Sequence, residues 1–256
     1  MKIDVLTVFP EMFDSVLDAS MLARARDKGV IDVAVTDIRA FSDDKHRKTD
    51  GYPFGGGAGM VMSMQPIAAA LTHIGTEGKR LIYLSPRGRI LNEELITDLS
   101  RTPELVLLCG HYEGVDERAI DRFGFEEISI GDYILTGGEL PAMVLIDAVA
   151  RMLPGTLGND SAHDEESVYS GLLEYPQYTR PAVWADASGA GLPVPDVLLS
   201  GNHKEIRLWN FRQALYLTAE RRPDMFTAYM NSERVRTLDK DEKKIVKEVL
   251  AELRGI

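Results

Sequence analysis

The chain has 256 residues, 45% of them hydrophobic, and a formal net charge of −11 at pH 7, a size that allows one large domain or one domain with a smaller second one. The acidic balance taken alone argues against a nucleic-acid partner, because phosphate contacts need lysine and arginine. No apolar run reaches the roughly 18–20 residues of a membrane span, and the first residues lack the features of a signal peptide, so we expect a cytoplasmic protein that does not enter a membrane.

The first 153 residues alternate between two kinds of segment. Short apolar or β-branched runs that end in turn signals predict five strands, at residues 2–9, 30–38, 80–85, 104–110 and 125–130. Helix-compatible stretches lie at 11–28, 65–74, 91–100 and 140–153, the last of them almost entirely apolar. This order is typical of an α/β domain with a largely parallel sheet. The lone Cys109 lies in the fourth strand and is expected to be a buried thiol.

The composition changes after residue 154. Residues 155–166 are small, polar and acidic, with no apolar periodicity, and two helices are predicted further on, at 203–219 and 238–254. We therefore expect an α/β domain over 1–158, a flexible acidic linker over 159–172, and a small helical domain over 173–256.

Two segments run against the acidic balance. Residues 200–222 carry five basic side chains against two acidic ones, and a second basic cluster occupies 45–48. Each is either an ordinary solvated face or a set of phosphate contacts, and the pattern alone does not separate the two.

Turn-forming residues follow three of the predicted strands, at 85–89, 110–114 and 131–139. Ligands of open parallel sheets bind beyond the carboxyl ends of the strands, so these segments form either a binding site or ordinary glycine-containing turns. The glycine-rich stretch 55–60 lacks the lysine of a phosphate-binding loop. The five histidines have no metal-ligand spacing, so no metal site is predicted. With Glu113 and Asp132 nearby, such a site suits a neutral or cationic ligand with an adenine-like ring better than a triphosphate.

Six segments carry a resemblance to a known family: 52–62, 81–88, 109–119, 129–155, 171–181 and 198–210. In this order and spacing they closely resemble the bacterial tRNA (guanine-N1)-methyltransferases, the TrmD family. The resemblance implies the SPOUT fold, in which a largely parallel sheet carries a deep C-terminal trefoil knot and a small helical domain that binds tRNA follows.

The resemblance also implies that three late loops hold the methyl donor S-adenosylmethionine in a bent shape. The matching positions in this sequence are Tyr83, Leu84, Ser85, Pro86, Gly110, Glu113, Ile130, Gly131, Asp132, Tyr133, Ile134, Leu135, Gly137, Gly138 and Pro141. Family members are homodimers whose active site is shared between subunits. Magnesium is known as a helper ion of the family, but the sequence offers no ligand set for it.

The implied substrate is the guanosine at position 37 of tRNA, beside the anticodon. Its ring nitrogen 1 carries a proton, so a base must remove it, and a donor at the neighbouring carbonyl oxygen lowers the barrier. Arg151 matches the family's arginine in the second role, unless it only caps its helix. Glu166 stands where the family has an aspartate base, with Glu165 and Glu174 as alternatives.

Overall fold

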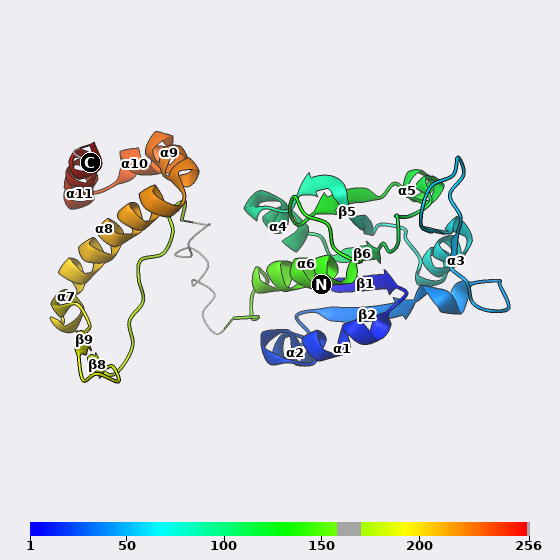
Figure 1. Cartoon of the computed structure of the whole chain (residues 1–256), viewed down its shortest axis with the longest axis horizontal. Helices are drawn as coiled ribbons and strands as arrows, with labels where there is room; N and C mark the ends of the chain where they lie inside the picture. Colours follow the sequence, from blue (N-terminus) through cyan, green and yellow to red (C-terminus); the bar gives the residue numbers. More distant parts are fainter. Residues whose placement is uncertain (158–169, 255–256) are drawn as a thin grey trace. The chain divides into compact units, whose positions relative to one another are not determined.

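A five-stranded sheet organises the first part of the chain. The computed structural model describes residues 1–157 and 170–254, which belong to two compact units, Met1–Asp160 and Ser161–Ile256. In the first unit the strand order is β2-β1-β6-β5-β7 and every neighbouring pair is parallel (Figure 1). The strands are β1 (Lys2–Thr7), β2 (Asp32–Asp37), β5 (Arg80–Ile90), β6 (Glu104–Cys109) and β7 (Glu126–Ser129). The predicted parallel α/β sheet and its five strands are confirmed.

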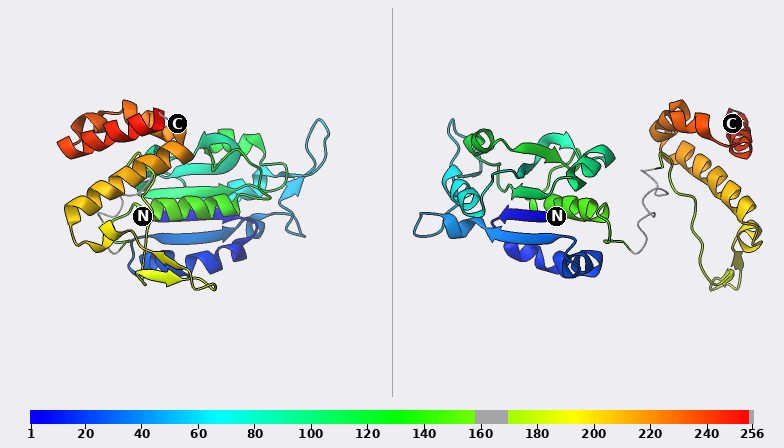
Figure 2. Two further views of the ribbon diagram at one scale, coloured as in Figure 1. Left: turned by 60° about the vertical axis from the view of Figure 1, so that its left-hand side comes forward. Right: turned by 180° about the vertical axis from the view of Figure 1, so that it is seen from behind.

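Helices cover both faces of this sheet (Figure 2). Along β6, Leu105, Leu107 and Cys109 face one core cluster, whereas Val106 and Leu108 face the other, as the two-residue period of a strand requires. The first cluster packs against α1 (Asp14–Leu17), α2 (Ser20–Asp27), α4 (Glu93–Ser100) and α6 (Glu139–Arg151). The second packs against α3 (Met64–Ile74) and α5 (Glu117–Phe123). Because both of its faces are buried, the central strand β6 is a nearly continuous apolar run.

The prediction of one continuous helix over 11–28 is wrong. The structure has a 3-10 turn, η1 (Pro10–Met12), and then α1 and α2 as separate helices. Ala19 is extended between them, and the Arg26 guanidinium donates a hydrogen bond to the Leu17 carbonyl at 3.2 Å. That bond satisfies a carbonyl at the end of α1, so the chain stops one helix there before it starts the next.

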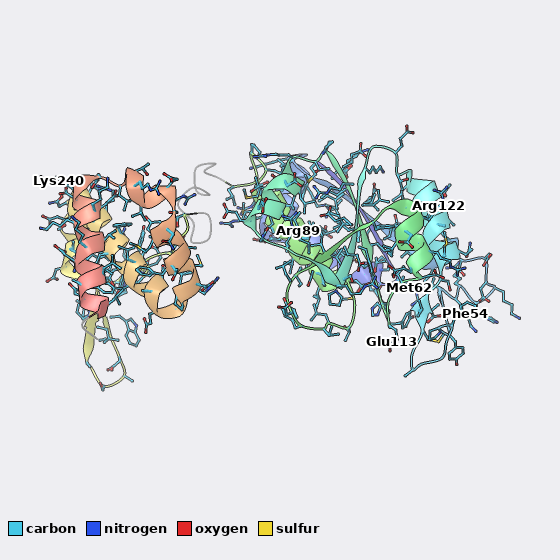
Figure 3. All side chains as sticks on the ribbon, turned by 90° about the horizontal axis from the view of Figure 1, so that it is seen from above. Phe54, Met62, Arg89, Glu113, Arg122 and Lys240 are labelled. Atoms are coloured by element: carbon cyan, nitrogen blue, oxygen red, sulfur yellow. The ribbon has the colours of Figure 1, made fainter. Side chains whose placement is uncertain are left out.

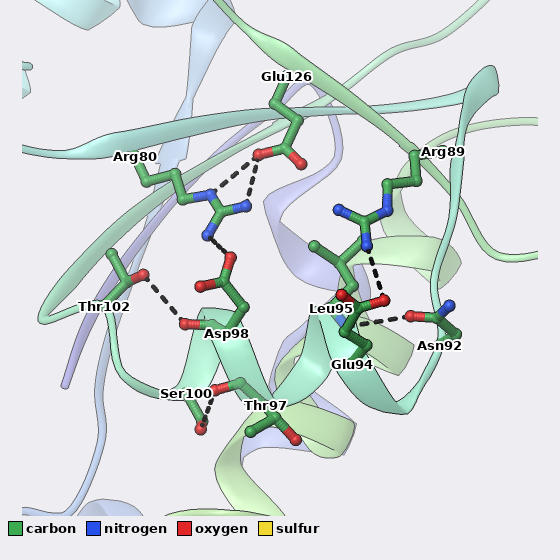
Figure 4. A network of polar contacts seen from close by, with 10 residues as sticks. All are labelled: Arg80, Arg89, Asn92, Glu94, Leu95, Thr97, Asp98, Ser100, Thr102 and Glu126. Carbon is green, nitrogen blue, oxygen red and sulfur yellow. Dashed lines mark hydrogen bonds and ion pairs between the residues drawn. The ribbon is translucent and has the colours of Figure 1, made fainter.

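Charged side chains fasten α4 to the sheet (Figure 4). Arg80 of β5 forms ion pairs with Asp98 of α4 at 2.6 Å and with Glu126 of β7 at 2.8 Å. Asn92 caps the start of α4, since its side chain accepts a hydrogen bond from the Leu95 amide at 3.0 Å. These contacts hold the amino-terminal halves of β5 and β7 together, and their carboxyl ends carry the candidate site.

The remaining elements of the first unit are short. A small hairpin joins β3 (Asp50–Gly51) to β4 (Val61–Met62), and η2 (Ile38–Phe41) follows β2. Neither the hairpin nor α5 was expected from the sequence. β5 is longer than the predicted strand, because it pairs with β7 a second time at Arg89 and Ile90 after a register shift.

The second unit is mainly helical. The predicted helices near 203–219 and 238–254 are confirmed as α8 (His203–Arg221) and α11 (Lys240–Arg254). Not expected were α7 (Asp196–Leu199), α9 (Pro223–Asn231), α10 (Glu233–Thr237) and the hairpin of β8 (Val183–Ala185) with β9 (Gly191–Pro193). Leu172, Leu215 and Val249 lie in its core and join the start of the unit to α8 and α11.

Candidate functional site

A cavity of about 400 Å³ lies at the carboxyl ends of β5, β6 and β7. It collects fourteen of the fifteen residues that the resemblance assigns to the cofactor. They are Tyr83, Leu84, Ser85, Pro86, Gly110, Glu113, Ile130, Gly131, Tyr133, Ile134, Leu135, Gly137, Gly138 and Pro141. Asp132 is the exception, since it is exposed and does not line the cavity.

The cavity is also lined by six residues that the sequence analysis did not single out: His111, Tyr112, Gly114, Ile128, Ser129 and Thr136. Each lies within or beside a segment that was singled out. In the sequence, His111 is noted only as one of five histidines without metal-ligand spacing, and its place between Gly110 and Glu113 is the signal that identifies it.

Backbone atoms of two loops lie unusually close together beside the cavity. The Gly138 amide donates a hydrogen bond to the Gly110 carbonyl at 2.8 Å, and Gly137 forms an isolated antiparallel bridge with His111. A Cβ atom on Gly138 would lie 2.7 Å from the Cys109 Cα and 2.8 Å from the Gly110 nitrogen. Backbone cannot yield as a flexible side chain can, so this position requires glycine.

The loop that follows β6 is fastened to the β3–β4 hairpin. The Glu113 amide donates to the Met60 carbonyl at 3.0 Å, and the Met62 amide donates to the Gly114 carbonyl at 2.9 Å. Figure 3 labels Met62, Glu113 and Phe54 in this part of the first unit. The hairpin loop, with the fully exposed Phe54 at its end, is thereby continuous with the wall of the cavity.

Burial at and beside the cavity favours the neutral, protonated forms of Tyr83 and Cys109. Burial raises the pKa of the Tyr83 hydroxyl, and the Glu127 carboxylate adds to that shift. Burial also raises the pKa of the Cys109 thiol well above its ordinary value, with a further contribution from Glu139. The expectation of a buried cysteine is confirmed, and a thiol in this state is a poor nucleophile.

Arg151 does not reach this cavity within its own chain. It is the last residue of α6, a helix of 13 residues whose first turn supplies Pro141 to the cavity wall. At about 1.5 Å per residue, Arg151 lies about 18 Å along the axis from Glu139. Glu165 and Glu166 lie outside the described residues, and Glu174 is exposed in the second unit.

No group of three or more histidine, cysteine, aspartate or glutamate side chains within 1–157 and 170–254 could hold a metal ion. Across the same described ranges, no helix combines the length and apolar character needed to cross a bilayer.

The basic side chains of 200–222 face carboxylates. Lys204 pairs with Asp241 at 2.6 Å and Arg207 with Asp239 at 2.8 Å. Arg207 also pairs with Glu242, Arg212 pairs with Glu248 and Glu252, and Arg222 pairs with Asp224. The local positive charge that the sequence indicates is therefore largely offset by Asp224 of α9 and by acidic residues in and just before α11.

The chain is similar to a set of curated proteins over most of its length. Three of them bear the name tRNA (guanine-N(1)-)-methyltransferase. The protein of Ruminiclostridium cellulolyticum is 52% identical over 234 residues, 90% of this chain and 98% of that protein. That of Geotalea uraniireducens is 53% identical over 229 residues (89% and 91%), and that of Syntrophomonas wolfei is 47% identical over 250 residues (98% and 97%).

A family model described as tRNA (Guanine-1)-methyltransferase TrmD matches residues 1–228, which include the whole sheet, every residue of the cavity and α8. Because this match spans most of the chain and the relatives are about half identical to it, the chain belongs to the TrmD family.

Proposed function

We propose that this protein transfers a methyl group from S-adenosylmethionine to ring nitrogen 1 of the guanosine at position 37 of tRNA, where a guanosine precedes it. The observation that carries the proposal is the cavity at the ends of β5, β6 and β7, which gathers the residues that the family resemblance assigns to the methyl donor. The relatives' printed name supplies the reaction type.

The residues of the cavity fit S-adenosylmethionine. Its volume of about 400 Å³ is within the range of about 300–1,000 Å³ found for small-molecule sites. Apolar side chains such as Leu84, Ile128 and Pro141 suit an adenine ring, and Glu113 offers a carboxylate to a cationic group. The missing Cβ at Gly138 lets the loop 131–138 pack directly against the backbone of Cys109 and Gly110 beside the cavity.

When bound, S-adenosylmethionine supplies an electrophilic methyl group. Nitrogen 1 of neutral guanine holds a proton, so its lone pair is available only after a carboxylate of the protein has accepted that proton. Glu166 is our assignment for this base, by its place in the family motif, with Glu165 and Glu174 as alternatives. The Arg151 guanidinium donates to the guanine carbonyl oxygen, where negative charge develops as the proton leaves.

The distance of Arg151 from its own cavity supports an active site that two copies share. About 18 Å of helix separates Arg151 from Glu139 at the cavity end of α6. In the proposal, Arg151 therefore contacts the substrate bound at the cavity of a second protomer. An apolar surface for such a partner is present beside the cavity, since Ile134 is 79% and Leu140 50% exposed. A homodimer is therefore part of the proposal.

We extend the proposal to the trefoil knot of the SPOUT fold. The second pairing of β5 with β7 at Arg89 and Ile90, and the hydrogen bond that closes Gly138 onto Gly110, support crossing of the late loops. The proposed division remains a knotted domain over 1–158, an acidic linker over 159–172 and a tRNA-binding domain over 173–256. The family resemblance adds magnesium as a helper ion, for which the residues that the structure describes offer no ligand group, and we expect the reaction to take place in the cytoplasm.

Methyl transfer to unmodified tRNA tests the proposal. Transcripts with guanosine or adenosine at position 37 are incubated with wild type and with Glu166→Gln, and incorporation of labelled methyl is measured. We expect transfer to the guanosine transcript alone and a loss of about 10²–10⁴-fold in the variant. Glu165→Gln and Glu174→Gln are the matched controls and should stay near wild type.

Other outcomes identify other functions. Transfer to both transcripts would point to a methyltransferase for a different RNA site. Cofactor and tRNA binding without any turnover would point to an RNA-binding protein that keeps the fold. A fully active Glu166→Gln with an inactive control variant would move the base to the residue replaced in that control.

A further inference from the structure

Glu139 is a buried carboxylate that the proposed chemistry does not use. It is the first residue of α6, and only 1% of its surface is exposed. An ionised carboxylate away from water is costly unless other groups compensate it. Its neighbours therefore show what it does, and it does not itself line the cavity.

One oxygen of Glu139 is held by β1. The Thr7 hydroxyl donates to Glu139 Oε1 at 2.7 Å, and the same hydroxyl accepts a hydrogen bond from the Phe9 amide at 2.9 Å. The Thr7 hydroxyl thus uses its single proton for the Glu139 carboxyl group and a lone pair for the Phe9 amide. The position at the amino-terminal end of α6 favours a carboxylate.

The other oxygen faces the cavity loops. Glu139 Oε2 lies 3.6 Å from His111 Nε2, within ion-pair distance. The His111 ring packs edge-on against Phe9, with ring centroids 4.7 Å apart, and His111 lines the cavity. The pair lies directly beneath Gly137, where a Cβ would come within 2.7 Å of His111 Nε2.

We propose that Glu139 is a positioning residue for the cofactor cavity: fixed by Thr7, it holds the His111 imidazole and so keeps the loops 110–114 and 131–138 in the conformation that binds S-adenosylmethionine. This inference rests on the proposed function, because it takes the cavity to be the methyl-donor site. Through Thr7, the proposal links the end of β1, which supplies no residue to the cavity, to the shape of the cavity.

The test is calorimetric titration of the full chain with S-adenosylmethionine and with S-adenosylhomocysteine. Glu139→Gln keeps the size of the side chain and an oxygen acceptor for Thr7 but removes the charge next to His111. We expect it to weaken binding of both ligands about 10-fold, and His111→Gln to do the same. The double variant should bind no more weakly than the weaker single variant, because the two residues act as a unit.

Two readouts separate positioning from a general structural role. With saturating S-adenosylmethionine, kcat of Glu139→Gln should stay within about twofold of wild type while KM for the cofactor rises. Glu94→Gln, the same change on an exposed first-turn glutamate of α4, should alter neither constant. His111→Gln replaces a partly exposed side chain and keeps the test open should Glu139→Gln not fold.

Each outcome has one meaning. Wild type that binds neither ligand would overturn the proposed function and this inference with it. Wild-type binding with unchanged affinity in both single variants, or with losses that add in the double variant, would overturn this inference and leave the proposed function standing.

Discussion

The cavity end of the first unit and the α8–α11 pair of the second unit use charge in opposite ways. Tyr83, Cys109 and Glu139 are buried at or behind the cavity wall, Glu113 of the wall is exposed, and most of the lining is glycine and apolar side chains. Between α8 and α11, exposed arginine and lysine side chains alternate with carboxylates in a row of surface ion pairs. Buried charge fixes geometry, whereas exposed pairs of this kind contribute little to stability and exchange readily.

This difference has a functional consequence for the proposed tRNA contacts. An exposed ion pair is worth about 0–1 kcal/mol, so a phosphate can displace a carboxylate from Arg207 or Arg212 at small cost. The cavity has no comparable freedom, because its shape depends on close backbone packing at Gly138. We therefore expect small changes to be severe at the cavity and graded on α8.

Of the changes predicted here, Gly138→Ala should have the largest effect, a loss of S-adenosylmethionine affinity at the cavity. The new methyl group would meet the Cys109 and Gly110 backbone at 2.7–2.8 Å, and strain of about 1–3 kcal/mol from such overpacking corresponds to a loss of about 5–150-fold in S-adenosylmethionine affinity. Titration calorimetry measures it, and tRNA affinity should change much less.

Gly51→Ala is the matched control, since its Cβ would meet only Ser63 Oγ, at 3.9 Å. Equal affinity in the two variants would show that the close approach at Gly138 does not shape the site.

Neutralising the acids opposite Arg212 should have a smaller effect with the opposite sign. In Glu248→Gln/Glu252→Gln the guanidinium loses both ion-pair partners. If α8 contacts phosphate, tRNA binding should tighten a few-fold, and the slope of log affinity against log salt should steepen by about 1. Filter binding over a series of salt concentrations measures both.

Glu77→Gln serves as the control, because it removes a negative charge from an exposed site of the first unit. Weaker tRNA binding by the double variant, accompanied by a lower melting temperature, would mean that the pairs serve only to join α8 to α11.

The sequence predicts the sheet and the cavity loops well because both depend on local signals. Buried parallel strands must be apolar runs, and loops at their ends must contain turn residues. Thus 104–110 and 125–130 are recognisable as strands, and 110–114 and 131–139 as turn segments that follow them, without knowledge of their partners.

What the sequence does not predict depends on partners distant along the chain. Glu139 resembles an ordinary acid at the start of a helix, and only the fold brings it to Thr7, 132 residues away. The positive charge of 200–222 is likewise real in the sequence, but α11 lies beside it and supplies the carboxylates. Between α1 and α2, Arg26 likewise reaches back to the Leu17 carbonyl, a contact that the helix pattern of 11–28 does not indicate.

Cys109 makes the cavity end sensitive to alkali. Burial raises its pKa above the ordinary value of 9.0, so the folded chain holds the thiol proton more tightly than the unfolded chain does. The resulting stability is present below pH 9 and decreases as the pH rises above it. Thermal unfolding between pH 7 and pH 11 should show a falling midpoint for wild type and a weaker fall for Cys109→Ala.

Tyrosine ionisation contributes to the same slope, because burial raises the pKa of Tyr83 as well. The difference between wild type and Cys109→Ala is therefore the quantity to compare. Identical slopes would show that the thiol ionises as freely in the folded chain as in the unfolded one.

The second unit should instead be sensitive to acid, with the smallest effect of the four. The Arg222 guanidinium donates hydrogen bonds to Asp224 and lowers the pKa of that carboxyl from 3.8 to about 2. A depressed pKa in the folded chain gives stability that is complete above the ordinary value and is lost as the pH falls from about 4 to about 2. Because Asp224 is exposed, the stability that it contributes is small and is best measured at low salt. We expect the melting temperatures of wild type and Asp224→Asn to converge as the pH falls towards 2. Curves that stay parallel across this range would show that the Arg222–Asp224 pair does not persist in solution. This exposed pair would then differ still more from the buried Glu139 beside the cavity, which has fixed hydrogen-bond partners.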